Sequence, residues 1–435
     1  MQVDQTTLTD LAIVNNNEAE SLFHLFDTTQ TTGGKFYLQE LLLSPLKSID
    51  SINDTQKTLQ YLSQIKQSIP TNISNGTVMV MEKFYDTAID TYPTHCNALN
   101  CFFYSIFSKA DFSLSKYSLQ HFIEFVKGVK KMRALLDESK SNIIKFWIEK
   151  IELHTNKIWI NTLLEISDVK SISNKQILDV ASNLRNHFKH DCFELIEIFC
   201  KIDAYLSIVN AINKYDFNFP NFIETEEPCI KANSIYHPLL SKAIAYNVEL
   251  RREENFLFLT GANMAGKSTF IKAVGISIYL SHLGFPVPAK QLQLSYFDGL
   301  LSNINIVDNI FKNESYFFNE VKRIKSTIEK IGDNKKWLIL IDELFKGTNI
   351  QDAMKCSLTV INGLQKKQNA VFILSTHLYE IGEDLKQHNN IQFKYFETSV
   401  INHELCFSYQ LKDGISNDKL GYLILEREGV VSLLN

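Results

Sequence analysis

The sequence predicts a multidomain protein in which an all-α domain is followed by an α/β domain with a mostly parallel sheet. Between about residues 75 and 215, proline is almost absent and apolar residues recur every three or four positions, which is the period of packed helices. After a break at Phe217 to Pro228, short apolar runs alternate with helical stretches. We therefore expect a first domain over residues 1–225 and a second over residues 226–435.

Helices are expected in order along the first domain. Residues 1–20 have little apolar periodicity and predict a frayed start or a short helix. An amphipathic helix is predicted from Lys35 to Leu43, and another from Ser51 to Ile69, which Pro70 ends. Two apolar stripes then predict long packed helices. Their residues are Leu119, Phe122, Ile123, Val126, Val129, Met132 and Leu136, and Leu195, Ile198, Ile202, Leu206, Val209 and Ile212.

Composition limits the classes of protein. The 435 residues contain no apolar run of 18 or more and no basic, apolar leader, which predicts a cytoplasmic protein without a membrane partner. The seven cysteines are scattered and none forms a C-x-x-C pair, so reduced thiols are expected. Residues 1–228 hold 21 basic and 28 acidic residues, and residues 229–435 hold 23 and 21. Bulk charge therefore does not predict nucleic-acid binding. One local basic cluster comprises Lys127, Lys130, Lys131 and Arg133.

A phosphate-binding loop is predicted where an apolar strand, Phe256 to Thr260, leads into a helix. Glycines let the backbone wrap around anionic oxygens, which successive amides and the helix N-terminus then stabilise. Lys267 adds a positive charge, and the Ser268 hydroxyl can bind a Mg²⁺ ion that the phosphates also hold. The pattern therefore predicts a nucleoside triphosphate and Mg²⁺. The loop comprises Gly261, Ala262, Asn263, Met264, Ala265, Gly266, Lys267, Ser268 and Thr269.

Two further apolar strands end in polar residues. Trp337 to Ile341 leads to Asp342 and Glu343, where Asp342 would bind Mg²⁺ and Glu343 would orient and polarise the attacking water. The strand Ala370 to Leu374 leads to His377, which can donate to the γ-phosphate. In a mostly parallel sheet the nucleotide binds outside the carboxyl ends of the strands. These patterns predict a P-loop ATPase with ATP and Mg²⁺ as cofactors.

Several of these segments together resemble the MutS family of DNA mismatch repair ATPases. The phosphate loop carries Asn263-Met264 inside it, as in that family. Further similar segments are Tyr236-His237-Pro238, Phe285 to Ala289, Gly347-Thr348, Ser375-Thr376-His377, Leu25 to Leu46 and Ile202 to Phe222. The resemblance implies an all-α core and lever domain followed by an ABC-type P-loop ATPase domain.

The resemblance also implies roles for individual residues. Asn263 would contact the nucleotide, and His237 and Pro238 would lie near the adenine. Asp308 to Glu320 resembles the signature segment through which Ser315 of one subunit approaches the γ-phosphate held by the other. The family therefore implies a homodimer, or a heterodimer with another MutS-type subunit, that binds DNA. ATP hydrolysis would drive a dimeric clamp or lever in mismatch repair or related DNA metabolism.

The sequence departs from the family pattern at several points. Lys312-Asn313 stands where small residues including glycine are usual, and Phe345-Lys346 replaces the usual Gly-Arg. The family's mismatch-reading and connector domains would precede residue 20, and the sequence has no room for them there. No strand-rich clamp insertion is recognised, and the sequence stops at Asn435, short of the usual C-terminal dimer extension. Two other functions therefore remain open: an ATPase acting on branched nucleic acid or ribosomes, and a regulatory ATP-binding subunit with weak hydrolysis.

Overall fold

The chain forms two compact units, each assembled from more than one stretch of sequence. The computed structural model describes residues 1–14, 20–70, 73–89, 92, 98–305, 316–401, 404–416 and 433. The α/β unit comprises Met1–Leu25, Leu42–Ile52 and Ile212–Asn435, and the helical unit comprises Phe26–Leu41 and Asn53–Ala211. The division of the sequence at residues 225 and 226 stays a prediction, because the compact units interleave along the chain. Within the described ranges, no helix combines the length and apolar character needed to cross a bilayer.

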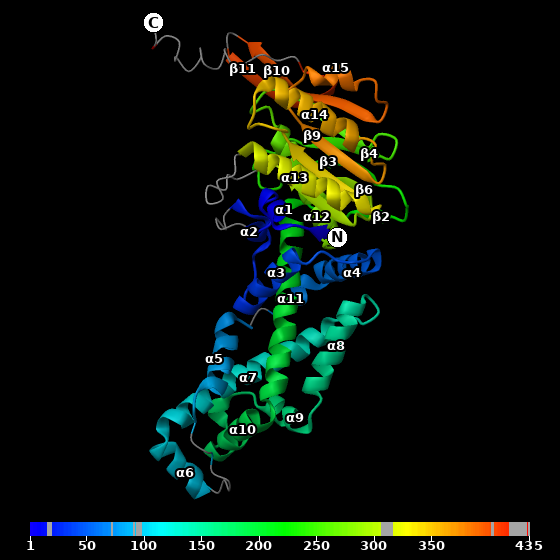
Figure 1. Ribbon diagram of the computed structural model, residues 1–435. Helices are drawn as coiled ribbons and strands as arrows, with labels where there is room; N and C mark the ends of the chain where they lie inside the picture. The colour runs from blue at the N-terminus through cyan, green and yellow to red at the C-terminus, as the bar shows by residue number, and fades with distance from the viewer. Residues whose placement is uncertain are drawn as a thin grey trace. The chain divides into compact units, whose positions relative to one another are not determined.

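The helical unit contains the packed helices that the apolar periodicity predicts (Figure 1). Side chains cap several helices: Ser74 accepts from the Thr77 amide, and Ser173 and Gln176 form a capping box. The predicted stripe from Leu119 to Leu136 is buried. The helices with most of their residues in this unit are α3 Thr32–Leu43, α4 Ile49–Ile65, α5 Asn75–Asp86, α6 Ala98–Phe107, α7 Lys109–Leu135, α8 Asn142–Thr155, α9 Ile158–Glu165, α10 Asn174–His187 and α11 Lys189–Tyr215.

The α/β unit is built on two sheets. The larger has the strand order β1-β7-β8-β9-β5-β10-β11, with parallel neighbours except for β10 and β11. The smaller has the order β2-β6-β3-β4. The predicted mixed architecture with a parallel-rich sheet is confirmed. The elements are β1 Gln2–Val3, α1 Gln5–Asp10, α2 Leu22–Phe26, β2 Asn221–Ile223, β3 Cys229–Ile235, β4 Tyr246–Arg251, β5 Phe256–Thr260, α12 Lys267–His282, β6 Gln291–Ser295, β7 Gly299–Asn303, α13 Tyr316–Lys330, β8 Trp337–Asp342, α14 Ile350–Leu364, β9 Ala370–Ser375, α15 Ile381–Leu385, β10 Ile391–Ile401 and β11 Glu404–Asp413.

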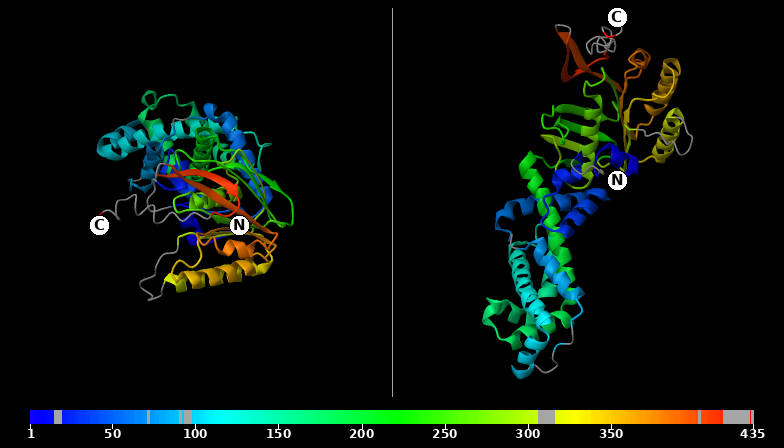
Figure 2. Two further views of the ribbon diagram at one scale, coloured as in Figure 1. Left: turned by 90° about the horizontal axis from the view of Figure 1, so that it is seen from above. Right: turned by 90° about the vertical axis from the view of Figure 1, so that its left-hand side faces the viewer.

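Helices cover both faces of the larger sheet. On one face lie α13 and α14, which contribute Ile324, Ile361 and Leu364 to a core with the buried strands (Figure 2). On the other face, α12 contacts β8 and β9 of the larger sheet and β3 of the smaller one. Almost every residue of α12 from Phe270 onward is buried, as expected of a helix that is apolar around its whole circumference. This packing fixes the start of α12 beside the ends of the strands.

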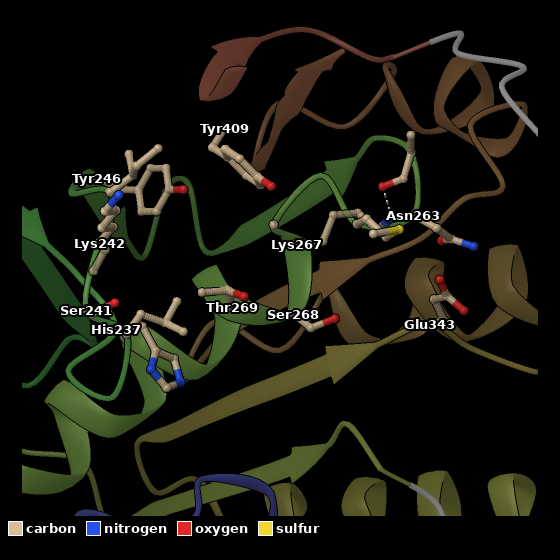
Figure 3. Close-up of a pocket in the computed structure, with 16 residues that line it drawn as sticks. His237, Ser241, Lys242, Tyr246, Asn263, Lys267, Ser268, Thr269, Glu343 and Tyr409 are labelled. Carbon is tan, nitrogen blue, oxygen red and sulfur yellow. Dashed lines mark hydrogen bonds between the residues drawn. The ribbon is translucent and has the colours of Figure 1, made fainter. Parts of the chain in front are cut away.

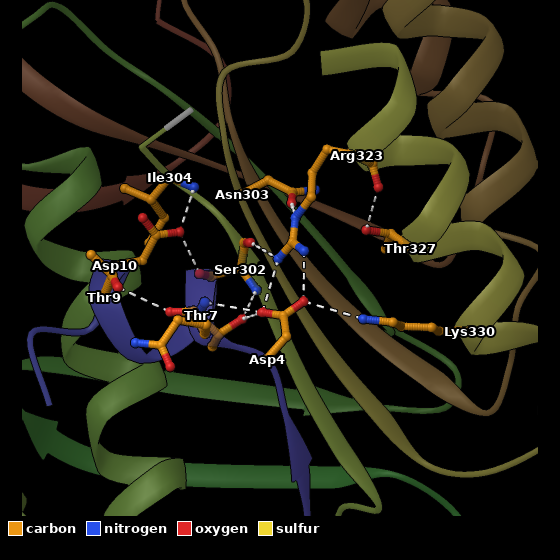
Figure 4. Close-up of polar contacts among 11 residues, drawn as sticks. Asp4, Thr7, Thr9, Asp10, Ser302, Asn303, Ile304, Arg323, Thr327 and Lys330 are labelled. Carbon is orange, nitrogen blue, oxygen red and sulfur yellow. Dashed lines mark hydrogen bonds and ion pairs between the residues drawn. The ribbon is translucent and has the colours of Figure 1, made fainter. Parts of the chain in front are cut away.

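The N-terminal residues add a strand to the larger sheet, which the sequence does not predict. The expected short helix is α1, but β1 precedes it and pairs in parallel with β7. The buried Asp10 carboxylate accepts from the Ser302 hydroxyl and from the amides of Ile304 and Asn305 (Figure 4). These bonds satisfy backbone donors that follow β7. Two residues are too few to show the alternating pattern of a β-strand in the sequence, so only the pairing with β7 defines β1.

A second polar contact joins the N-terminal residues to α13. Arg323 donates to the Asp4 carboxylate at 2.6 Å, to the Ser302 carbonyl at 2.7 Å and to the Asn303 side chain (Figure 4). Burial alone raises the pKa of Asp4, but hydrogen bonds from Arg323 and Thr7 outweigh it and hold that pKa well below its usual range. The Asp4–Arg323 pair is therefore charged at neutral pH. Together with the bonds to Ser302 and Asn303, it fixes α13 against β7 and the N-terminal residues.

Candidate nucleotide-binding site

The loop between β5 and α12 has the backbone conformation that its glycines permit. Gly261 and Gly266 have φ angles of 141° and 108°, a region that residues with a Cβ rarely adopt. A Cβ at Gly261 would also lie 3.2 Å from the Cβ of Phe396. Gly266 is the N-cap of α12, so the first free amides of this helix face the loop. The predicted loop therefore has the geometry of an anion site at a helix N-terminus.

Lys267 lies beneath this loop. Its side chain is buried, with 4% of the residue exposed, and Nζ donates to the carbonyls of Gly261 at 2.7 Å and Ala262 at 3.0 Å. Burial lowers the pKa of the Lys267 ammonium, while Glu343 and Asp342 act in the opposite direction. The buried cation thus holds the loop carbonyls and is available to an anion in the loop.

Asp342 links the loop to the ends of two strands. It is the last residue of β8 and lies in register with Ser375, the last residue of β9. One carboxylate oxygen accepts from the Ser268 hydroxyl and the other from the Ser375 hydroxyl. Hydroxyl and carboxylate oxygens are the ligands that Mg²⁺ prefers. Among the described residues no group of three or more His, Cys, Asp or Glu side chains could hold a metal ion.

Glu343 lies between two basic side chains. Its Oε2 is 3.3 Å from Nζ of Lys346, and its Oε1 is 3.6 Å from Nδ1 of His377. The His377 ring contributes most to lowering the pKa of Glu343 to about 2; Lys346 and Lys267 act in the same direction and burial opposes them. Glu343 is therefore fully ionised at neutral pH. The sequence identifies Lys346 only as a departure from the family, and its contact with Glu343 is evident only in the structure.

A pocket of about 510 Å³ connects these groups. In Figure 3, Glu343 and Asn263 lie on one side of the pocket, Tyr246 and Lys242 lie on the other, and Lys267 and Ser268 lie between them. The structure thus brings residues of the predicted phosphate loop together with Glu343 and His237, which are also candidate site residues. The lining residues are His237, Leu240, Ser241, Lys242, Ala243, Ile244, Tyr246, Ala262, Asn263, Met264, Gly266, Lys267, Ser268, Thr269, Glu343 and Tyr409.

Other predicted residues lie outside this lining. Asp342 accepts a hydrogen bond from the Ser268 hydroxyl but does not line the pocket, and His377 lies beside Glu343. Pro238 follows His237 in a turn but does not line the pocket. Ser315 falls outside the described residues, so the predicted contact in trans is not part of this geometry. Burial, and secondarily Lys272, lowers the pKa of His237 to about 4, so this imidazole is neutral at pH 7.

Two tyrosines that the sequence does not predict as site residues line the pocket. Tyr246 is on β4 and Tyr409 is on β11, and both line the pocket. The Tyr246 ring packs edge-on against Phe270 and Phe396 at 5.4 and 5.6 Å between centroids. Aromatic rings beside a phosphate loop offer a surface on which a nucleobase can stack. Each residue is an isolated tyrosine in its own strand, so no motif marks it.

The predicted basic cluster on α7 is partly occupied by contacts within the chain. Nζ of Lys127 donates to the Ile166 carbonyl at 2.7 Å, and Arg133 pairs with Glu152 at 2.6 Å. Lys130 is half-buried and Lys131 is exposed. Four adjacent cations in the sequence therefore do not form one uniform phosphate-binding patch.

Comparisons with known proteins identify the family. The chain matches MutS domain III over residues 6–310 and MutS domain V over residues 257–431. It is 28% identical to the DNA mismatch repair protein MutS of Pseudothermotoga lettingae over 55% of this chain and 29% of that protein. It is 28% identical to the human MutS protein homolog 4 over 56% of this chain and 26% of that protein. The DNA mismatch repair protein MutS of Thermotoga maritima is 22% identical over 99% of this chain and 64% of its own length.

The chain thus spans less than two thirds of each of these relatives. The match to MutS domain III alone nevertheless covers more than half of the chain, and the match to MutS domain V contains the phosphate loop, Asp342 and Glu343. These matches agree with the resemblance seen in the motifs, and the chain belongs to the MutS family.

Proposed function

We propose that the chain binds ATP with Mg²⁺ and hydrolyses it in a P-loop ATPase domain, residues 226–435, that follows an all-α core and lever domain, residues 1–225. The observation that carries this proposal is the pocket in which the phosphate loop faces Glu343 while Asp342 contacts Ser268. The loop, the buried Lys267 ammonium, the Ser268 hydroxyl and the Glu343 carboxylate then surround one volume. Phosphoryl transfer needs such positioning and charge stabilisation more than it needs covalent chemistry.

Each residue has a distinct role in this proposal. The loop amides and Lys267 bind the phosphates, Ser268 and Asp342 hold Mg²⁺, and His377 contacts the γ-phosphate from beside Glu343. The adenine would lie toward His237, Pro238 and the two tyrosines. Mg²⁺, when bound, neutralises charge on the phosphates. A carboxylate with a pKa of about 2 is a weak proton acceptor, so Glu343 acts chiefly by orienting and polarising the attacking water.

We further propose that the protein acts on DNA, in mismatch repair or related DNA metabolism, as a homodimer or heterodimer in the cytoplasm. Two of the relatives described above are DNA mismatch repair proteins by name. ATP-driven movement of a lever or clamp is the proposed output. The ion pair of Lys346 with Glu343 favours one alternative, a regulatory ATP-binding subunit with weak hydrolysis, because it engages the carboxylate that water would otherwise contact.

One set of measurements separates these functions. We expect saturable ATP binding in an equilibrium titration with Mg²⁺, and hydrolysis of the bound ATP in single-turnover experiments. A gel-shift panel of homoduplex, mismatched, branched and single-stranded DNA plus structured RNA should show DNA binding that weakens as salt rises. ATP binding without turnover would identify a regulatory subunit. Preference for branched DNA or RNA would support the other alternative, and no binding to any nucleic acid would refute action on DNA.

The dimer proposal predicts that two inactive variants restore activity when mixed. In Lys267→Ala the subunit's own phosphate loop is damaged, and in a bulky Ser315→Arg the contact with the partner's γ-phosphate is blocked. Each mixed dimer then holds one site damaged twice and one intact site, so hydrolysis should partly return. Subunit exchange is monitored by fluorescence transfer between labelled chains. A mixture that exchanges subunits yet stays as inactive as its components would rule out sites completed in trans.

A further inference from the structure

The loop that follows β8 has a strained backbone. Glu343 and Phe345 have φ angles of 64° and 59°, the left-handed region that residues other than glycine seldom adopt. Such conformations cost free energy and persist only where surrounding contacts fix them. Since Glu343 is the carboxylate that faces the pocket, the contacts that fix this loop also fix its position.

Glu320 of α13 supplies the most specific of these contacts. Its side chain is buried, with 2% of the residue exposed. One carboxylate oxygen accepts from the Lys346 amide at 3.0 Å, and the other accepts from the Gly347 amide at 3.2 Å. Burial raises the pKa of Glu320, and these two amides act against that rise. A buried carboxylate is costly unless it is hydrogen-bonded, and here its partners are backbone donors of the Glu343 loop.

A second contact from the same helix holds the loop one residue earlier. The Phe345 ring is buried and lies 5.7 Å from the ring of Phe317, measured between centroids. Phe317 and Glu320 are three residues apart on α13 and therefore lie on the same face of the helix. The first turns of α13 thus hold the side chain of Phe345 and the two amides that follow it.

The helix that carries these contacts is itself fixed one turn later. Arg323 joins α13 to Asp4, to the Ser302 carbonyl and to Asn303 (Figure 4). Because α13 is fixed in this way, the Glu320 side chain is held in place against the loop that carries Glu343. Rigid contacts behind a reacting group keep it within the small range of positions that catalysis allows.

We propose that Glu320 is a positioning residue for ATP hydrolysis: by binding the amides of Lys346 and Gly347 it holds the strained loop in which Glu343 faces the nucleotide pocket. The inference rests on the proposed ATPase function. Glu320 does not line the pocket and takes no part in the chemistry. Its loss should therefore lower the rate of hydrolysis without weakening ATP binding.

Glu320→Gln tests this with little change in volume. The amide retains one acceptor but places an NH₂ group against a backbone N–H, so one of the two bonds is lost. We expect kcat per titrated ATP site to fall by about 10- to 100-fold, which is the scale of a small misplacement of a catalytic group. The Kd for ATP should stay within about twofold, because phosphate contacts dominate binding. Glu329→Gln on the same helix, where Glu329 forms an exposed pair with Lys325, is the matched control and should match wild type.

The outcomes distinguish this inference from the proposed function. If wild type hydrolyses ATP and Glu320→Gln hydrolyses it equally fast per bound ATP, the positioning role is refuted and the ATPase proposal stands. If wild type shows no hydrolysis, both are refuted. An equal loss of ATP sites and of turnover leaves the rate per bound ATP unchanged, and it refutes the positioning role in the same way. Should Glu320→Gln fail to fold, hydrogen exchange of the wild-type chain decides: the amides of Lys346 and Gly347 should exchange slowly, and rapid exchange overturns the proposal.

Discussion

Glu343→Gln should lower single-turnover ATP hydrolysis by about 10²- to 10⁴-fold while ATP remains bound. The substitution keeps the shape of the side chain but removes the negative charge that polarises the attacking water. Without the carboxylate, the variant has no negatively charged acceptor to hold water against the γ-phosphate. ATP affinity should change little, because Glu343 does not contact the phosphates in the proposed arrangement.

The matched control is Glu383→Gln, because Glu383, which is on α15, forms an exposed pair with Lys386. It should hydrolyse ATP at the wild-type rate. The pH profile gives a second check. A carboxylate whose pKa is about 2 keeps its charge as the pH falls from 8 to 5 and loses it only near pH 2. Glu343 should therefore cause no loss of activity on the acid side in that range, and turnover in Glu343→Gln close to wild type would show that another group positions the water.

Lys267→Ala should weaken ATP binding by at least about 100-fold. A hydrogen bond to a charged group contributes about 1.5 to 3 kcal/mol, and about 1.4 kcal/mol is a tenfold change in affinity. The ammonium would contact more than one phosphate oxygen, and Lys267 also holds the carbonyls of Gly261 and Ala262. The variant therefore loses the direct attraction to the phosphates and the hydrogen bonds that order the loop, and both losses weaken binding.

Titration of Mg²⁺–ATP by calorimetry checks this result. Circular dichroism should show that the helices remain folded, because the change is confined to the α/β unit. Lys355→Ala, an exposed lysine on α14, is the control and should bind ATP as wild type does. Unchanged affinity in Lys267→Ala would refute the assignment of the phosphate loop.

The part of the site that is continuous in sequence could be predicted, and the part assembled by folding could not. The candidate phosphate loop is one segment, and Asp342 comes at the end of an uninterrupted apolar strand, so local patterns predict both. Tyr246 and Tyr409 come together only because β4 and β11 lie beside the loop. Glu320 accepts from backbone amides, which nearly every residue type carries, so the sequence of the loop does not predict this contact. The proposed role of Ser315 lies outside the described residues and stays a prediction.

The pairing of β1 with β7 has a consequence for the order in which the protein folds during synthesis. Gln2 pairs with Gly299, and the Thr7 hydroxyl accepts from the Ser302 amide, 295 residues later in the chain. At about 5 to 20 residues per second, the ribosome needs roughly 15 to 60 s to produce that partner. Pairing between segments so far apart in the sequence can form only after the later segment has been synthesised. Residues 1–10 leave the ribosome well before residues 299–305, yet they belong to the part of the α/β unit that is completed only with those later residues.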